Sequence, residues 1–332
     1  MENALFRDTS IGPVLIEGNL FLAPLAGYTD RAFRSICRQW GAFFAYSEMV
    51  SSEGLARDSV NTAALMQRGT EEQQLGIQIF LNDAAVAQRS LPSLLKANPT
   101  VIDINCGCPV PKVVKTGSGS ALLKTPQKIY DIVQVLTQET TIPVSVKIRT
   151  GWDHSCINYL ETADAALSGG ASMLTMHART KSMGYSGKAN WQALKELKLF
   201  IAKHYPTIPL FGSGDLFSAK DAQKMLLETG VDGVMFARGA MGNPFIFKET
   251  IHLLTTEEEL PPISLEVKIE TLNKHLYLLG QDIGEEQACR QMRKHAPAYL
   301  SGIPHAKKAK QLINQALSYA QYAEVTRQII EG

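Results

Sequence analysis

The 332-residue sequence lacks several patterns that mark common protein classes. Its five cysteines are odd in number and show no paired C-x-x-C spacing, which argues against a disulfide framework and a metal site. No stretch approaches the roughly 18 consecutive apolar residues that span a bilayer. Arg7, Asp8 and Glu17 precede any long apolar run, unlike a signal peptide. We therefore expect a protein of the reducing cytoplasm, with no membrane partner.

An excess of charge is also missing. Lys and Arg number 33 and Asp and Glu 32, so the net charge of +1 does not identify a partner, and any basic surface must be local. A dinucleotide-binding G-x-G-x-x-G is absent after the first expected strand, which weakens the alternative of an open doubly wound sheet.

Short apolar runs bounded by Gly, Pro, Asn or Asp recur through the first three quarters of the chain and predict eight strands. Helical periodicity separates most of them, for instance over residues 126–139 and 158–168. Alternating strands and helices of this number predict a TIM (β/α)8 barrel over residues 1–250. The expected strands cover residues 20–23, 43–46, 76–80, 101–104, 144–148, 173–176, 210–211 and 233–236.

The alternation stops after residue 244. The acidic residues 257–259 and the prolines at 261–262 predict a linker, and residues 260–332 have only helical patterns, so we expect an all-helical second domain. Between residues 287 and 323 there is no Asp or Glu, whereas Arg290, Arg293 and Lys294 follow one another at helical spacing. Such a face suits a phosphate backbone. The alternative is a solvated face balanced by acids of the barrel.

Polar residues gather where the expected strands end, which is where barrel enzymes carry their catalytic groups. Glycines at 212, 214, 239 and 242, beside Arg238, suit a phosphate, although turn glycines alone would give the same pattern. Lys147 and Arg149 share one face of a strand and suggest an anionic ligand such as a reduced flavin; a lysine paired with a structural carboxylate is the alternative.

Two further residues at the strand ends could take part in catalysis or in ligand binding. Cys108 stands between Gly107 and Pro109 and suits a nucleophile or an acid, whereas a lone cysteine is otherwise a small buried hydrophobe. His177 closes the sixth strand and suits contact with a phosphate or flavin, unless it is a core histidine bonded to backbone.

Taken together, these segments resemble the tRNA-dihydrouridine synthases, and more narrowly their bacterial B-type subfamily. The resemblance rests on residues 22–31 (LAPLAGYTDR), 103–109 (DINCGCP), 147–152 (KIRTGW), 177–180 (HART), 212–215 (GSGD) and 237–244 (ARGAMGNP). It implies an FMN-bound barrel with a helical tRNA-binding domain, which reduces the C5=C6 bond of uridine in tRNA with NADPH as electron source.

The resemblance also implies roles for single residues. Hydride comes from flavin N5 and a proton from Cys108, which alone has Gly before it and Pro after it, although Cys106 adds a second thiol nearby. FMN is expected to contact Pro24, Leu25, Ala26, Gln78, Lys147, His177, Ser213, Gly214, Asp215, Ala237 and Arg238. The substrate is expected to contact Asn105, Arg149, Arg179, Lys181, Arg290, Arg293 and Lys294.

Two other functions remain open at this point. One is an FMN barrel oxidoreductase acting on a small pyrimidine-like substrate. The basic segment at residues 287–323, which contains no Asp or Glu, argues against this function. The other is a non-catalytic RNA-binding protein that keeps the barrel as a scaffold. A monomer without an obligatory protein partner is expected.

Overall fold

The central element is a parallel sheet that curls into a barrel. A computed structural model describes residues 5–303 and 306–331, so parts of both expected domains, namely residues 1–4, 304–305 and 332, lie outside the described residues. Nine strands pair in the order β4-β3-β13-β12-β11-β8-β7-β6-β5. They are β3 (Leu20–Leu22), β4 (Phe44–Ala45), β5 (Val50–Ser51), β6 (Gly76–Phe80), β7 (Val101–Asn105), β8 (Val144–Arg149), β11 (Met173–His177), β12 (Leu210–Ser213) and β13 (Gly233–Phe236).

The sheet closes on itself between β4 and β6. Tyr46, directly after β4, forms a parallel bridge with Gly76, and the Ser47 N–H donates to the Gly76 carbonyl at 2.8 Å. β4 and β5 are therefore two pieces of one barrel position, interrupted by residues 46–49. The nine strands fill the eight positions of a (β/α)8 barrel, which confirms the predicted fold class.

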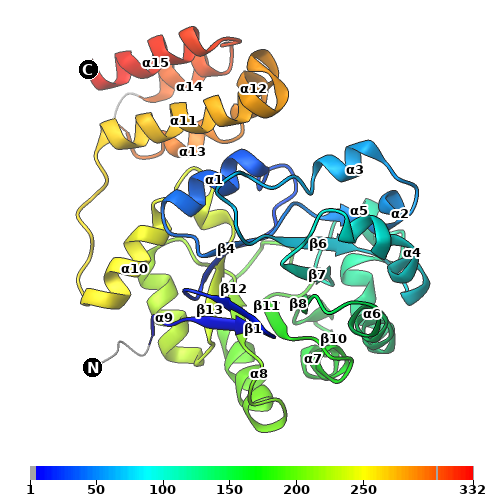
Figure 1. Ribbon diagram of the computed structural model, residues 1–332. Helices are drawn as coiled ribbons and strands as arrows, with labels where there is room; N and C mark the ends of the chain where they lie inside the picture. The colour runs from blue at the N-terminus through cyan, green and yellow to red at the C-terminus, as the bar shows by residue number, and fades with distance from the viewer. Residues whose placement is uncertain (1–4, 304–305, 332) are drawn as a thin grey trace.

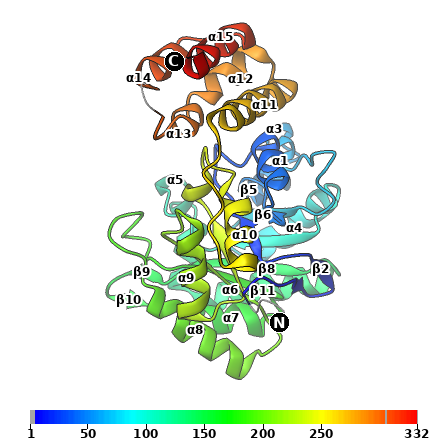
Figure 2. The ribbon, with the colours of Figure 1, turned by 90° about the vertical axis from the view of Figure 1, so that its left-hand side faces the viewer.

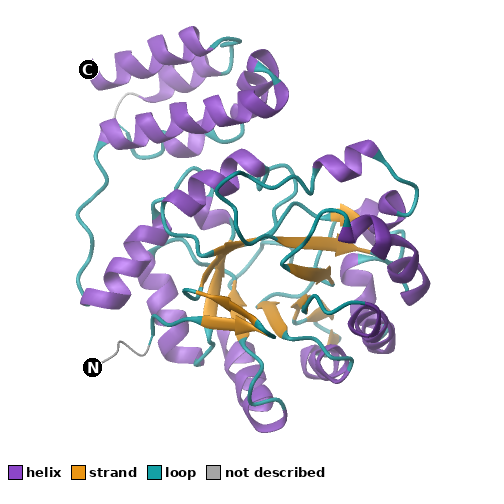
Figure 3. Cartoon of the chain, in the orientation of Figure 1, coloured by secondary structure: helices purple, strands orange, loops and turns teal. Residues whose placement is uncertain are grey.

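Helices surround the barrel on its outside (Figures 1 and 3). The expected helix 126–139 forms with Pro126 in its first turn, where the missing N–H costs nothing, and the helix expected over 158–168 begins after Asn158, its N-cap. The outer elements are α1 (Arg31–Gln39), α2 (Ser52–Leu55), α3 (Val60–Ala64), α4 (Ala84–Leu95), α5 (Pro111–Val114), η1 (Gly119–Lys124), α6 (Pro126–Glu139), α7 (Tyr159–Ser168), α8 (Trp191–His204), α9 (Ala219–Thr229), η2 (Arg238–Ala240) and α10 (Ile246–Thr256).

One end of the barrel is filled. Phe21 packs against Phe44 and Phe211 at ring-centroid distances of 5.2 and 4.2 Å, and glycine makes room for these rings: a Cβ on Gly233 would lie 2.4 Å from Phe211. The antiparallel hairpin of β1 (Thr9–Ile11) and β2 (Val14–Ile16) packs against this layer through Ile11 and Ile16. This floor leaves the other end, where the strands finish, available for a cavity.

The last helices form a bundle with its own apolar core (Figure 2). It contains α11 (Leu265–Ile283), α12 (Glu285–Met292), α13 (Ala296–Tyr299), α14 (Ala306–Ile313) and α15 (Tyr319–Glu331). Residues 257–264 join it to α10, which packs against α9 and extends the barrel a few residues beyond the expected limit of 250. Among residues 5–303 and 306–331, no helix is long and apolar enough to cross a membrane.

The bundle rests on α1, the first helix of the barrel. Ala32 of α1 belongs to the apolar core of the bundle, and the Phe33 ring stacks on His275 with centroids 5.3 Å apart. The Arg31 Nε donates to Asp282 at 3.0 Å. Residues 23–28, which precede α1, reach the cavity described next, so the seam between the domains borders that cavity.

Candidate active site

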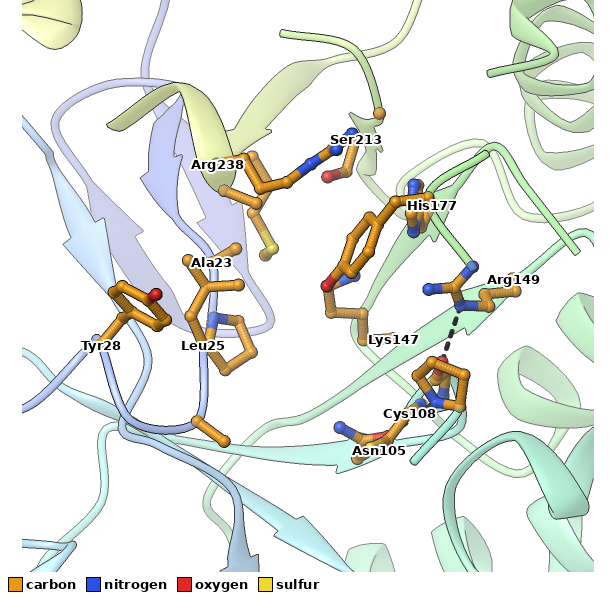
Figure 4. A pocket seen from close by; sticks show the side chains of 18 of the residues that line it. Ala23, Leu25, Tyr28, Asn105, Cys108, Lys147, Arg149, His177, Ser213 and Arg238 are labelled. Carbon is orange, nitrogen blue, oxygen red and sulfur yellow. Dashed lines mark hydrogen bonds between the residues drawn. The ribbon is translucent and has the colours of Figure 1, made fainter. Parts of the chain in front are cut away.

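A cavity of about 430 Å³ opens at the carboxyl ends of the barrel strands (Figure 4). All eleven residues that the family resemblance assigns to FMN line it, as do Cys108, Asn105 and Arg149. A cavity of this size lies within the range of cofactor sites. The lining also contains large side chains to which the sequence analysis gave no role, among them Tyr28, Met49, Tyr185, Phe217, Met235 and Met241.

The loop that carries Cys108 is held on both sides of the thiol. The Cys108 N–H donates to Asn105 Oδ1 at 2.8 Å, and its carbonyl accepts from Ser120 N–H and Oγ at 3.1 and 2.6 Å. Gly119 (φ 62°) approaches so closely that a Cβ there would lie 2.9 Å from the Cys108 carbonyl oxygen. Burial raises the pKa of the Cys108 thiol, so it carries its proton at neutral pH. Cys106 instead lies in the hydrophobic core.

A buried hydrogen-bond chain fixes Asn105. Asp103 accepts from Gln78 Nε2 at 2.6 Å, and the Gln78 Oε1 accepts from Asn105 Nδ2 at 2.7 Å. Because an ionised carboxylate only accepts hydrogen bonds, Asp103 determines which end of each amide faces the next group. The chain thereby leaves Asn105 Oδ1 to receive the N–H groups of Gly107 and Cys108. Burial raises the pKa of Asp103 to about 6, so it is mostly ionised at neutral pH.

The cavity is electropositive. Burial, and then the charges of Arg149, Lys147, Arg179 and Arg238, hold the pKa of His177 well below its ordinary value, so this histidine is neutral at pH 7. Burial also lowers the pKa of Lys147 to about 8. Among the described residues no carboxylate lies within ion-pair distance of the Lys147 ammonium, so the alternative of a structural ion pair does not apply. This cavity suits an anionic ligand.

A second group of residues that could bind an anion lies directly after β12. The N–H groups of Gly214 and Asp215 donate to no described residue, and Arg238 lies 3.5 Å from Asp215. Gly214 has φ 118°, and a Cβ there would lie 2.9 Å from Ala189 and 3.0 Å from His177, so only glycine fits. Two free neighbouring N–H groups beside a guanidinium form an anion-binding concavity.

Arg149 ties two loops of the cavity wall together. Its Nε donates to the Gly107 carbonyl at 2.7 Å, and its Nη1 donates to the carbonyls of Thr180 and Gly184 at 2.9 and 3.0 Å. Nη2 donates to no described residue and remains available on the cavity side. The loop of Cys108 and the loop after β11 are thus fixed to each other.

The remaining residues assigned to the substrate are not gathered at the cavity. Arg179 is 2% exposed, and its Nη2 donates to both carboxylate oxygens of Asp215 at 2.7 and 2.8 Å. Arg179 is therefore not among the residues that line the cavity, and its guanidinium is bonded to Asp215, which does line it. Lys181 lies over the Trp152 ring, 4.3 Å from its centroid, outside the cavity lining.

The three cations of the bundle have different surroundings. Arg290 is exposed and pairs with Glu286 at 2.7 Å, while the Arg293 Nε is buried without a described partner. Lys294 lies 5.4 Å from the ring centroid of Tyr28, which lines the cavity. Of the three, Lys294 comes nearest to the cavity rim.

Fold and site together define a class, the (β/α)8 barrels with an electropositive cavity at the carboxyl ends of their strands. The family model for dihydrouridine synthase matches residues 21–331. A probable tRNA-dihydrouridine synthase of Treponema pallidum is 45% identical over 98% of this chain and 97% of that protein. The chain belongs to the dihydrouridine synthase family, which confirms the predicted enzyme class and the resemblance.

Other comparisons agree. The tRNA-dihydrouridine synthase B of Pseudomonas syringae is 36% identical over 92% of this chain and 89% of that protein. Among solved structures, 2-naphthoyl-CoA reductase has a TM-score of 0.59 at 10% identity, over 76% of this chain and 52% of that one. An old yellow enzyme homologue of Zymomonas mobilis has a TM-score of 0.53 at 12% identity, over 79% and 95%. Both support the barrel fold.

Proposed function

We propose that this protein reduces the C5=C6 bond of specific uridines in tRNA to 5,6-dihydrouridine, with FMN as bound cofactor and NADPH as reductant. The proposal rests on one observation: a protonated Cys108 thiol and a set of anion-binding groups line the same cavity. The chain that contains this cavity belongs to the dihydrouridine synthase family. Relatives named tRNA-dihydrouridine synthase support the substrate.

The residues of the cavity fit FMN on two counts. The free N–H groups of Gly214 and Asp215, with Arg238, suit the phosphate, and the Lys147 ammonium without a carboxylate partner suits a ring that becomes anionic on reduction. When bound, FMN supplies the hydride that it receives from NADPH. Pro24, Leu25 and Ala26 add apolar groups to the cavity lining, and Leu25 lies across the cavity from Lys147 (Figure 4).

The Cys108 thiol has the role of general acid. A thiol whose pKa is raised by burial keeps its proton at neutral pH and can transfer it from Sγ to C5 of the pyrimidine. The free Nη2 of Arg149 and the fixed amide of Asn105 offer hydrogen bonds to the uracil edge. Residues of the helical bundle, above all Lys294 at the rim, contact the tRNA backbone.

The test uses Cys108→Ala, with Cys156→Ala as a matched control at a half-buried cysteine outside the cavity. We expect Cys108→Ala to keep its flavin and the bleaching of that flavin by NADPH, and to lose dihydrouridine in tRNA at least 100-fold, the usual size of an acid–base contribution. The control should retain both. Normal product from Cys108→Ala would refute the acid role, and a colourless wild-type protein that takes up no FMN would refute the function.

Substrate choice is tested in the same assay. Wild-type enzyme is supplied with tRNA and, separately, with free uracil and uridine. Reduction of tRNA alone agrees with the proposal, whereas efficient reduction of the free base would favour the small-molecule oxidoreductase.

A further inference from the structure

Five lysines lie on three neighbouring loops at the barrel rim. The loops follow β7 (residues 106–125), β8 (150–158) and β11 (178–190), and their only acidic residue is Asp153. We call these five residues the lysine rim: Lys112, Lys115, Lys124, Lys181 and Lys188. None of the five forms an ion pair with a described residue, in contrast to Arg290 of the bundle.

Two members of the lysine rim meet on one aromatic ring. The ammonium groups of Lys124 and Lys181 lie 3.6 and 4.3 Å from the centroid of Trp152. Trp152 belongs to β9 (Gly151–Asp153), which forms a hairpin with β10 (Cys156–Ile157). Two like charges on one indole concentrate positive charge at a point where a cation–π contact stabilises each of them.

Backbone contacts hold this arrangement in place. The Lys181 N–H donates to the Gly151 carbonyl and the Ser182 N–H to the Trp152 carbonyl, both at 2.9 Å. On the other side Asn158 Nδ2 donates to the Leu123 carbonyl at 2.7 Å, which ties the hairpin to η1. The nearby Asp153 carboxylate is turned into its own loop, where it accepts from Ser155 N–H and Oγ at 2.9 and 2.6 Å. A fixed pair of ammonium groups binds an anion with little ordering cost.

The lysine rim continues from the active-site cavity. Lys112 stands two positions after Val110, which lines the cavity, and Arg149 connects the Cys108 loop to the loop of Lys181. In Figure 2 the hairpin β9–β10 stands at the side of the barrel, below and away from the helical bundle. A polyanion that enters the cavity under Lys294 would therefore meet the lysine rim as well.

We propose that the lysine rim is a second RNA-binding surface, on which Trp152 positions Lys124 and Lys181 against phosphates of the tRNA. The inference rests on the proposed function. The tRNA is held from the bundle and from the barrel, with the target uridine between the two surfaces. Phosphate contacts of this kind orient the RNA and carry no sequence information themselves.

The test measures tRNA affinity of the full-length FMN-loaded protein by filter binding between 50 and 300 mM salt. Each lost phosphate contact lowers the slope of log Kd against log salt by about 0.7–0.9. Lys124→Ala/Lys181→Ala should bind tRNA about tenfold more weakly at low salt, with a slope lower by about 1.5. The matched control is Lys195→Ala/Lys203→Ala, two exposed lysines on the outer face of α8, which should behave as wild type.

Trp152 is tested by its own variants. Trp152→Leu should show the same loss as the lysine pair, whereas Trp152→Phe, which keeps an aromatic face, should retain most of the affinity; flavin content confirms that each variant is folded. Wild-type affinity and slope in the lysine pair variant would overturn the second surface, and so would an equal loss in the control. If wild-type protein binds no tRNA at any salt concentration, the proposed function itself fails.

Discussion

Asp103 offers the sharpest link between stability and function in this chain. Its carboxylate is buried, accepts from Ser145 Oγ and Gln78 Nε2 at 2.6 Å each, and sits at the start of the chain that fixes Asn105 and the Cys108 loop. Asp103→Asn keeps the shape and removes the charge. The new amide can turn either end toward Gln78, so it no longer determines the orientation of the chain.

The size of the effect follows from the pKa. Burial raises the pKa of Asp103 from 3.8 to about 6, and each unit corresponds to about 1.4 kcal/mol. Ionised Asp103 therefore costs the folded state about 3 kcal/mol at pH 8. Because the folded state binds the proton more tightly, this cost shrinks as pH falls through 6 and is roughly halved at pH 5. Asp103→Asn removes it and should raise the free energy of unfolding by up to these amounts.

The assay is urea unfolding of wild type and Asp103→Asn at pH 8 and pH 5, beside dihydrouridine formation at pH 8. We expect the variant to be more stable, with the larger gain at pH 8, and yet to lose activity because Asn105 is no longer fixed. Asp131→Asn, on the outer face of α6, is the control and should change neither property. A destabilised Asp103→Asn, or a gain that is equal at both pH values, would refute the reasoning.

Three other outcomes are expected. Lys147→Ala should weaken FMN binding at least tenfold, because it removes an ammonium group that has no carboxylate partner and is free to bind an anion. Titration of the apoprotein with FMN measures the Kd, and an unchanged Kd would contradict this prediction. Glu72→Gln should cost about 3–5 kcal/mol of unfolding free energy, since it leaves the fully buried Arg34 without its counter-charge; a loss below about 1 kcal/mol in urea would speak against this. Burial lowers the pKa of His275 to about 3, so the unfolded state binds the proton of this histidine first, and its contribution to stability should fall by about 2 kcal/mol between pH 8 and pH 5. His275→Phe should remove this contribution, and urea unfolding that shows the same difference between pH 8 and pH 5 in variant and wild type would contradict it.

The sequence predicted the barrel well because buried parallel strands have a strong local pattern. All eight expected strands form within one or two residues of their expected limits. The second strand differs from the prediction because the chain forms two short strands there, β4 and β5, on either side of residues 46–49. The bridge between Tyr46 and Gly76 shows that both short strands occupy the same place in the barrel. The β1–β2 and β9–β10 hairpins were not predicted, because two- and three-residue strands have too few alternating positions to be recognised.

The location of a site residue could be predicted from the sequence when it depends only on the end of a strand. It could not be predicted when it depends on hydrogen-bond partners that are distant in sequence. Cys108 and Lys147 line the cavity as expected from their positions after β7 and within β8. Arg179 also stands at a strand end, but its partner Asp215 is distant in sequence, so its burial could not be foreseen. The same applies to Asp103, whose role depends on Gln78 of the neighbouring strand.

The shared helix α1 has a mechanical consequence. Ala32 belongs to the core of the bundle, and the Phe33 ring, which lies in the core of the barrel, stacks on His275. Residues 23–26 and Tyr28, which precede α1, line the cavity, and the rings of Tyr28 and His295 have centroids 5.2 Å apart. A tilt of the bundle should therefore also displace the cavity residues that precede α1, because close-packed side chains transmit displacement. A ligand that tilted the bundle would in this way change the width of the cavity opening.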